Sequence, residues 1–532
     1  MLPKTQVLFY EKARKKLLNG VNLMANAVGS SLGPRGQNTA IARTAPNGEI
    51  YERIVLHDGV SISRSIELKD ETENMGASLL REAAQKQVDE VGDGTTVVMI
   101  LAQAIIQECM QLIGAGVNPM SLRVGLEEGI KKLIKELELM ALPIKNGKDL
   151  KFIATISAED KELGSLVAET LGKVGKDGII DVEESKSVET IVEHQLGMQL
   201  DKGMLHPYFM TNPERQEAVL ENAYFLITDH SITTLSGLGK FFEEFTKKSK
   251  NLVVISPDIS GEALPLFIQN KMQGKLFTLC VQAPSFGEDQ KNILQDIATL
   301  TGGKFWSQDA GYKLEDLTVK DLGFAESITS TKDETIIVGG RGSQEAIDTR
   351  IASIKTSLES VKSEFDQLKL KARLGKLTNG VAVIRVGGQT EIEMKERRER
   401  VLDAVAACRA ALEKGIVPGG EVALLYVRNI LKDSITDKIL YRALYKPFKK
   451  LIDNADISEI DTALALVGKG KNFGVDVTTG EIKDLVKAGI VDPVLVPISA
   501  LNNAISVAIQ IITTGCVITP YEMPKLSNNA SH

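Results

Sequence analysis

One short turn between two helical stretches carries residue types suited to phosphate chemistry. In Gly92-Asp93-Gly94-Thr95-Thr96 the glycines let the backbone approach a phosphate closely, and the threonine hydroxyls can donate hydrogen bonds to it. Asp93 could hold a divalent cation that bridges phosphate oxygens. A Gly-Asp-Gly turn also serves simply as a helix break, so the motif alone leaves both interpretations open.

Other turns and carboxyls could join this chemistry. The segment Leu32-Gly33-Pro34-Arg35-Gly36 forms a second turn of similar type at the end of the first long helical stretch. Asp58 precedes a glycine, and Asp403 lies between apolar neighbours on a helical stretch. A buried unpaired carboxyl is costly and would therefore point to function, whereas a surface aspartate explains the same pattern. Spacing alone does not show that these groups converge.

Composition bounds the class of protein. The chain of 532 residues has 43% apolar and 25% charged residues, which predicts a soluble globular protein of two or three domains. Its formal net charge of −7 argues against nucleic acid as the main partner, because an acidic surface repels phosphate backbones.

Cysteine spacing and apolar runs bear on location. The four cysteines form no CxxC pair, so neither a zinc site nor a disulfide framework is expected, and a reducing compartment fits best. The first residues resemble no targeting peptide, and we expect a cytoplasmic protein. The most membrane-like stretch, residues 494–517, contains Asn502, Asn503 and Gln510, so a buried helix is the better interpretation.

The elements needed to position these turns change along the chain. The first 140 residues and those after 391 show long helical periodicity. Between them, strand-like runs at 252–256 and 276–283 alternate with helical runs at 261–272 and 290–300, which predicts a parallel α/β domain. We therefore expect the two chain ends to form one domain, with the middle inserted. A heptad-like stripe from Ile351 to Leu368 predicts a helix packed against one neighbour.

Eight short segments, in order along almost the whole chain, share their pattern with one protein family. They are SLGPRGQN (31–38), DGVSISRSIEL (58–68), ENMGASLL (73–80), GDGTT (92–96), GMQLDKGMLHPYF (197–209), LQDIATLTGG (294–303), NGVAVIRVGG (379–388) and GIVPGG (415–420). As an ordered set covering about residues 8 to 520, they closely resemble the group I chaperonins, the family of bacterial GroEL. That resemblance implies an ATP-hydrolysing molecular chaperone whose ring chamber encloses unfolded proteins.

The resemblance implies a multi-domain, GroEL-like fold. A mainly α equatorial ATPase domain would comprise residues 1–139 and 414–532, and a discontinuous α+β intermediate domain residues 140–195 and 382–413. An inserted α/β apical domain, residues 196–381, would bind clients and the co-chaperonin. The hinges would be Pro143 and Gly415 at the lower joint, and Gly197 and Gly380 at the upper joint.

The resemblance also implies an ATP site with magnesium. Asp58 and Asp403 would be catalytic, orienting and deprotonating the attacking water, and Asp93 would ligate Mg²⁺. Ser31 and Thr96 are candidate K⁺ ligands. The nucleotide-binding residues would be Leu32, Gly33, Pro34, Asp93, Gly94, Thr95, Thr96, Ile156, Ser157, Gly420, Asp476, Val477, Ile490 and Asp492.

An exposed apolar face of the apical domain would capture clients, because hydrophobic contact is non-directional and tolerates many sequences. The same face would bind a small GroES-like lid, and the subunits would form two stacked rings of seven, with single rings as an alternative. The residues implied for this face are Met204, Tyr208, Phe209, Leu238, Phe242, Leu264 and Ile268.

Five positions depart from the family pattern. His57 replaces a lysine, Val97 the third threonine after the Gly-Asp-Gly turn, and Glu421 the third glycine of a Gly-Gly-Gly turn. Gly239 and Gln269 stand where apolar residues are usual. These changes put the rate, the K⁺ dependence and the client range in doubt.

Three other functions compete with the folding machine. An ATPase-impaired holdase or scaffold would bind proteins without productive cycles; retention of Asp58, Asp93 and Asp403 argues against it, whereas Glu421 and Gln269 favour it. A phosphotransferase built on the Gly-Asp-Gly turn would leave the matches beyond residue 190 unexplained. A group II chaperonin disagrees with the PYF and LQDIATLTGG segments.

Overall fold

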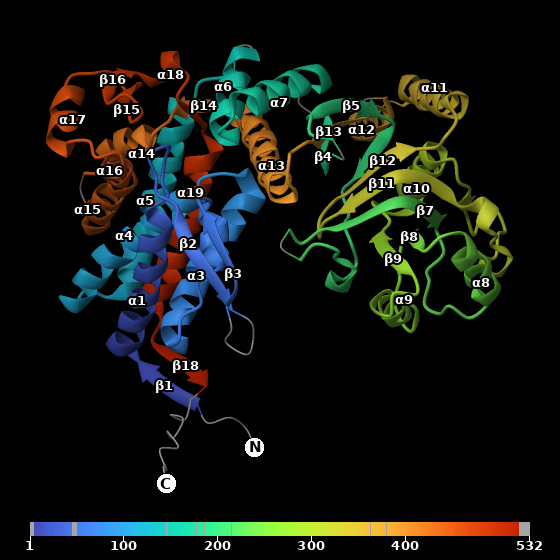
Figure 1. Ribbon diagram of the computed structural model, residues 1–532, viewed down its shortest axis with the longest axis horizontal. Helices are drawn as coiled ribbons and strands as arrows, with labels where there is room; N and C mark the ends of the chain where they lie inside the picture. The colour runs from blue at the N-terminus through green and yellow to red at the C-terminus, as the bar shows by residue number, and fades with distance from the viewer. Residues whose placement is uncertain are drawn as a thin grey trace, which may run out of the picture. The chain divides into compact units, whose positions relative to one another are not determined.

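The computed structural model describes residues 5–44, 50–144, 147–175, 178–185, 187–213, 215–361, 363–378, 380–432 and 434–520. The chain divides into two compact units (Figure 1). Unit 1 comprises Met1–Glu169 with Glu399–His532, and unit 2 comprises Thr170–Arg398. Both boundaries fall inside the segments expected for an intermediate domain, and the finer division into three domains stays a prediction.

Unit 1 is mainly helical and is built from both ends of the chain. Its helices are α1 Tyr10–Gly29, α2 Gly59–Arg64, α3 Glu71–Val91, α4 Thr95–Gly114, α5 Pro119–Met140, α6 Gly147–Ala158, α14 Val422–Val427, α15 Ile435–Ala443, α16 Lys446–Asn454, α17 Glu459–Leu466, α18 Leu485–Ala488 and α19 Leu495–Thr513. Helices α7 Lys161–Val174 and α13 Glu391–Lys414 run across the unit boundaries. Its strands are β1 Thr5–Phe9, β2 Thr39–Thr44, β3 Ile50–Leu56, β14 Ile416–Pro418, β15 Phe473–Asp476, β16 Glu481–Asp484, β17 Val491–Pro493 and β18 Cys516–Pro520.

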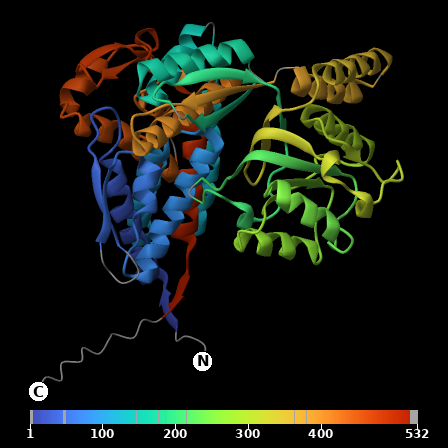
Figure 2. The same ribbon diagram turned by 45° about the vertical axis from the view of Figure 1, so that its right-hand side comes forward.

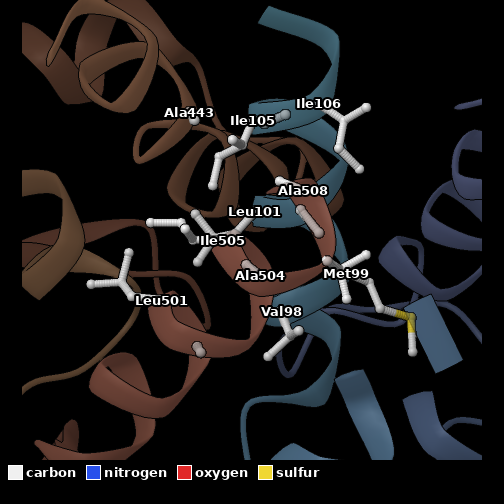
Figure 3. Close-up of a cluster of buried hydrophobic side chains, with 14 of the residues drawn as sticks. Val98, Met99, Leu101, Ile105, Ile106, Ala443, Leu501, Ala504, Ile505 and Ala508 are labelled. Atoms are coloured by element: carbon white, nitrogen blue, oxygen red, sulfur yellow. The ribbon is translucent and has the colours of Figure 1, made fainter. Parts of the chain in front are cut away.

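Helices α4 and α19 form the centre of the unit 1 core. Both are long and apolar enough to cross a membrane by length and composition alone. In this structure they pack against each other, and Figure 3 shows Leu101 and Ile105 of α4 beside Leu501 and Ile505 of α19. The burial of this stretch confirms the buried helix expected from its interrupting asparagines.

The two ends of the chain are joined by hydrogen bonds. Strand β1 pairs antiparallel with β18, from Thr5 opposite Pro520 to Phe9 opposite Cys516. The blue and red strands lie side by side in both views (Figures 1 and 2). This pairing continues the packing of α1 and α3 on α19, so the first and last helical stretches share one core.

Unit 2 is built around a mixed sheet in the order β6-β12-β11-β7-β8-β9, with β10 paired to β7. Strands β8 and β9 run parallel to β7, as the alternation of strands and helices predicts. A second sheet has the order β4-β13-β5. The elements are β4 Ile179–Glu184, β5 Ile191–Gln195, β6 Gly197–Leu200, η1 Pro207–Phe209, β7 Ala218–Thr228, α8 Gly239–Lys248, β8 Asn251–Ser256, α9 Ala263–Met272, β9 Phe277–Gln282, α10 Gly287–Thr301, β10 Phe305–Trp306, η2 Leu314–Asp316, η3 Val319–Asp321, β11 Gly323–Ser330, β12 Thr335–Gly340, α11 Gln344–Ser360, α12 Glu364–Thr378 and β13 Val381–Val386.

The stripe from Ile351 to Leu368 does not form one helix. Helix α11 ends at Ser360, Val361 adopts an extended backbone with φ −82° and ψ 129°, and α12 begins at Glu364. The two helices pack on each other. The prediction of a single helix is wrong because the apolar spacing happens to keep its phase across the break, and periodicity does not detect such a turn.

A buried carboxyl lies on β4 of unit 2. Asp181 is 6% exposed; its Oδ1 accepts a hydrogen bond from the N–H of Val182, and its Oδ2 has no partner among the described residues. Burial, together with the charges of Glu183 and Glu217, raises the pKa of Asp181 to about 7 against the opposing effects of the Val182 N–H and Arg398. Ionising this group therefore costs stability.

Replacing Asp181 with asparagine should remove that cost. The unfolded carboxyl ionises near 3.8 and the folded one near 7, so the penalty grows as the pH rises between these values and is complete above them. Asp181→Asn should match the wild type near pH 4 and exceed its stability by about 2–4 kcal/mol at pH 8. Urea unfolding at both pH values tests this, with the exposed Asp333→Asn as control. Equal gains at both pH values would contradict it.

Candidate functional site

Two glycines fix the shape of the Gly-Asp-Gly turn in unit 1. Gly92 (φ +72°) ends α3, and Gly94 (φ +83°) precedes α4. A Cβ at Gly92 would lie 2.4 Å from the Cβ of Ala406, and one at Gly94 would lie 2.7 Å from a methyl carbon of Val496. Only glycine fits both the left-handed backbone and the space, so the turn is held closely between α13 and α19.

The three carboxyls expected to act in hydrolysis come from segments that meet at this turn. A Cβ at Gly59 would lie 2.6 Å from the Oγ1 of Thr96, which places the Asp58 turn directly against the start of α4. The Oδ2 of Asp58 caps α2 by accepting from the N–H of Ser61 at 2.7 Å. A Cβ at Gly92 would also lie 3.7 Å from the backbone oxygen of Asp403. The structure therefore brings the Asp58, Asp93 and Asp403 segments together.

Two more carboxyls lie within electrostatic range of Asp93. Asp492 pairs with Val417 across β14 and β17, and Glu421 follows the Gly419-Gly420 turn. Burial, with a smaller contribution from Asp93, raises the pKa of Asp492 to about 7. Burial also raises the pKa of Glu421 to about 8, with contributions from Asp492 and then Asp93.

The surroundings of Asp93 destabilise the negative charge of its carboxylate. Burial raises its pKa against the opposing hydrogen bond from the N–H of Gly94 at 2.5 Å, and Glu159 and Asp58 raise it further. Carboxylate oxygens crowded in this way are stabilised by a divalent cation, and oxygen is the ligand that Mg²⁺ prefers. Asp93 therefore offers one carboxylate ligand suited to magnesium, and the described residues contain no group of three or more His, Cys, Asp or Glu side chains that could hold a metal ion by themselves.

The second turn, at the end of α1, faces another loop of unit 1. The side-chain amide of Asn454 donates to the backbone oxygens of Gly29 and Leu32 at 3.1 and 3.0 Å, and so fixes the end of α1. Arg35 donates to the backbone oxygen of Thr478 at 2.8 Å. The expected nucleotide residues Leu32–Pro34 and Asp476–Val477 therefore lie in neighbouring loops.

Asp476 differs from the other carboxyls because it is paired. Burial raises its pKa, but hydrogen bonds from Thr478 and from Lys483 at 2.9 Å outweigh this effect and lower the pKa to about 2. Asp476 is therefore ionised and held in place at neutral pH. The side chain of Leu451 joins this side to the rest, because it contacts both Gly33 and Gly420.

Helix α6 brings Ile156 and Ser157 to the same unit. The ring of Phe152 lies against Gly489, where a Cβ would meet it at 2.5 Å, so α6 packs on the turn that carries Ile490. The Ser157 hydroxyl is buried and has no hydrogen-bond partner among the described residues. Ile156 is exposed. A buried hydroxyl without a partner is a feature that a ligand could satisfy.

The residues expected to bind K⁺, those that depart from the family pattern near the site and two of the expected hinge glycines lie in different surroundings. Ser31 is buried and its hydroxyl donates to the backbone oxygen of Val28, while His57 hydrogen-bonds Asn38 at 3.1 Å. Val97 lies in the core of unit 1. The hinge glycines Gly415 and Gly380 have φ values of +89° and +61°. The roles of these residues in K⁺ binding and hinge motion stay predictions.

The expected client face is only partly exposed. Met204, Phe209 and Leu238 are buried, with Phe209 only 1% exposed, whereas Tyr208 is 62% exposed. Phe242, Leu264 and Ile268 are half-buried. The expectation that all seven side chains are exposed is wrong for the first three, because they belong to the hydrophobic core beneath α8 and α9.

Two positions that depart from the family pattern lie on these same helices. Gly239 begins α8 and has no atoms near its would-be Cβ, and Gln269 is exposed on α9. Lys271 holds the neighbouring 3-10 turn by donating to the backbone oxygens of Tyr208 and Met210 at 3.0 and 2.8 Å. The apolar surface available on this side is therefore smaller than the sequence suggests.

Family comparison agrees with this arrangement of segments. The pattern of the TCP-1/cpn60 chaperonin family matches residues 24–521. The chain belongs to that family. A chaperone role in protein folding follows from this membership.

Solved chaperonin structures share the fold. One is the chaperonin gp146 from the bacteriophage EL 2 (Pseudomonas aeruginosa), crystallised in the presence of ATP-BeFx; its crystal form II has a TM-score of 0.69 and 22% identity, covering 97% of this chain and 99% of that one. Crystal form I has a TM-score of 0.62 at the same identity and coverage. The GroEL-like, multi-domain fold class expected from the sequence is confirmed.

Glu421 gives a direct test of backbone strain in this chaperonin. Its φ of +62° lies in the left-handed region, which favours glycine. Glu421→Gly should be more stable than Glu421→Ala by about 1 kcal/mol, because both remove the carboxyl but only alanine keeps a Cβ at this φ. Chemical unfolding of the two variants measures the difference. Equal stabilities would show that position 421 carries no strain.

Proposed function

We propose that this chaperonin binds ATP with magnesium in unit 1 and hydrolyses it to drive the folding of other proteins. The observation that carries the proposal is the meeting of the Asp58, Asp93 and Asp403 segments around a glycine-rich turn at the start of α4. The chaperonin gp146, which shares the fold, was crystallised in the presence of ATP-BeFx, and this supports a nucleotide at the corresponding place.

Each residue of the turn has a distinct task in this proposal. Backbone N–H groups and hydroxyls of Thr95 and Thr96, at the first turn of the long helix α4, would bind phosphate oxygens. Asp93 would hold Mg²⁺, which supplies charge neutralisation for the phosphates. The loops of Leu32–Pro34, Asp476–Val477 and Ile490 would enclose the remainder of the nucleotide.

The attacking water would be handled by two carboxyls on different elements. The Oδ2 of Asp58 caps α2, so its Oδ1 is the atom that would accept a hydrogen bond from the attacking water. Asp403, on α13, would take the proton as general base. Because these carboxyls come from a short helix and from a long one, hydrolysis depends on the position of α13 relative to the Gly-Asp-Gly turn.

The proposal extends to partners and location. Unfolded client proteins would bind apolar side chains on α8 and α9 and at Tyr208, and a GroES-like lid would use the same surface. The subunits would assemble into two stacked rings of seven, with K⁺ near Ser31 and Thr96. All four cysteines are free thiols, which supports a reducing compartment such as the cytoplasm.

An ATPase-impaired holdase is the second candidate, and Glu421 favours it. Its carboxyl adds to the group formed by Asp93 and Asp492, where phosphates would have to bind. Exposed Gln269 on α9 is the other feature in its favour. A folding machine would hydrolyse ATP at a measurable rate, whereas an ATPase-impaired holdase would bind ATP without turnover.

Replacing Asp403 with alanine should lower steady-state ATP hydrolysis by at least about 100-fold, because general-base catalysis typically contributes this much. ATP affinity should stay within about threefold of the wild type. Turnover with magnesium, with and without K⁺, and equilibrium nucleotide binding test both statements. The control is Glu413→Ala, an exposed position on the same helix. Loss of ATP binding in Asp403→Ala would overturn the catalytic assignment, and a wild type that binds ATP without turnover would favour the holdase.

The client surface is tested at its most exposed residue. Tyr208→Glu should reduce capture of an unfolded model protein several-fold, because it places a charge on an apolar surface, and it should leave the thermal midpoint unchanged. Phe209 is unsuitable for this test, since a charge at a buried core position would unfold unit 2. Lys355→Glu, exposed on α11, controls for added negative charge. Unchanged capture by Tyr208→Glu would remove this residue from the surface.

A further inference from the structure

Two buried amide side chains lie directly beneath the Gly-Asp-Gly turn. Gln87 on α3 is 0% exposed and Asn503 on α19 is 2% exposed. Both are buried in the core of unit 1, where a polar side chain without partners would be costly. Hydrogen bonds to specific partners would offset the cost of burying these two amides.

Gln87 connects the turn to α19. Its Nε2 donates to the backbone oxygen of Asp93 at 2.9 Å and to that of Val496 at 3.2 Å. Its Oε1 accepts from the Nδ2 of Asn503 at 3.2 Å. The side chain therefore donates both to the turn and to Val496 at the start of α19, and accepts from Asn503 of α19.

Asn503 supports the orientation of the Gln87 amide that the two backbone oxygens require. Its Nδ2 also donates to the Oγ of Ser499 at 3.0 Å and to the Oε2 of Glu90 at 3.4 Å, and Ser499 donates to the same carboxylate of Glu90. If the Gln87 amide were flipped, its NH₂ group would face the NH₂ of Asn503. Its oxygen would then face two backbone oxygens. The network therefore permits one orientation of Gln87.

The hydrogen bond from Gln87 to the Asp93 carbonyl can affect the geometry of the turn because Asp93 lies between two glycines. Gly92 and Gly94 both adopt left-handed backbone conformations, and because glycine has no Cβ to restrict its backbone, the path of this turn depends on contacts from outside it. Val496 fills the space beside Gly94, and the Gln87 amide holds the carbonyl of Asp93. The direction of the Asp93 side chain then follows from the fixed backbone.

We propose that Gln87 is a positioning residue for Asp93, and that Asn503 keeps the Gln87 amide in the orientation that this requires. The inference rests on the proposed function, in which Asp93 holds the magnesium ion of the nucleotide. Groups that orient a metal ligand typically change metal affinity by about 10- to 100-fold when removed. The effect should therefore appear in the contribution of magnesium to nucleotide binding.

The test compares binding of a fluorescent ATP analogue in excess magnesium with binding in EDTA, using the full chain. Gln87→Met keeps the size of the side chain and removes the donor. It should reduce the gain in affinity that magnesium provides by about tenfold, and Asn503→Leu should reduce it by about threefold. Asn502→Leu, at the exposed neighbouring position on α19, is the matched control and should keep the wild-type gain.

The two conditions separate positioning from general damage. A loosened site would weaken binding equally with and without magnesium, and that result, or an unchanged gain in Gln87→Met, would overturn the inference. If Gln87→Met fails to fold, Asn503→Leu and the smaller change Asn503→Ser decide by the same criterion. A wild type that binds ATP without any gain from magnesium would instead overturn the proposed role of Asp93, and the inference with it.

Discussion

The packing of α4 against α19 is the contact on which unit 1 depends. It joins the first and last parts of the chain, and it holds the two ends of the candidate site at once, because α4 begins at Thr95 and α19 follows Asp492. Aliphatic side chains fill this contact almost completely (Figure 3). Burial of this kind is non-directional, so it brings the helices together without specifying the geometry of the turn.

Geometry at the turn comes instead from close backbone approaches and a few buried polar groups. Gly59, Gly92 and Gly94 allow contacts that any Cβ would prevent. The amides of Gln87 and Asn454 then hold backbone oxygens in fixed places, and Asn503 donates to the side-chain oxygen of Gln87. A hydrophobic core determines which segments meet, and these hydrogen bonds hold the backbone of the turns in place. Burial and mutual repulsion raise the pKa values of Asp93, Glu421 and Asp492, so a proton or a bound cation would stabilise these carboxyls.

The sequence predicts the positions of helices and strands better than it predicts which of their side chains are exposed. The strands near residues 252–256 and 276–283 and the helices between them follow from continuous apolar runs, which are typical of parallel strands buried on both faces. The stripe across Val361 was misleading because a break can preserve helical phase. Phe209 and Leu238 were expected on a surface because the resemblance concerns residue types, whereas exposure depends on the neighbouring helices.

Gln87 and Asn503 show why the candidate site could be predicted only in part. Family motifs identify groups that would touch the nucleotide, and the meeting of their segments in unit 1 agrees with that expectation. Gln87 lies only six residues before Asp93 but outside the quoted motifs, and Asn503 lies on a helix from the other end of the chain. In the sequence, Asn502 and Asn503 stand out only as polar interruptions of the apolar stretch that forms α19. Burying an amide costs free energy, so an asparagine in an apolar helix indicates that its side chain forms specific hydrogen bonds. In this structure Asn503 forms them with Gln87, Glu90 and Ser499.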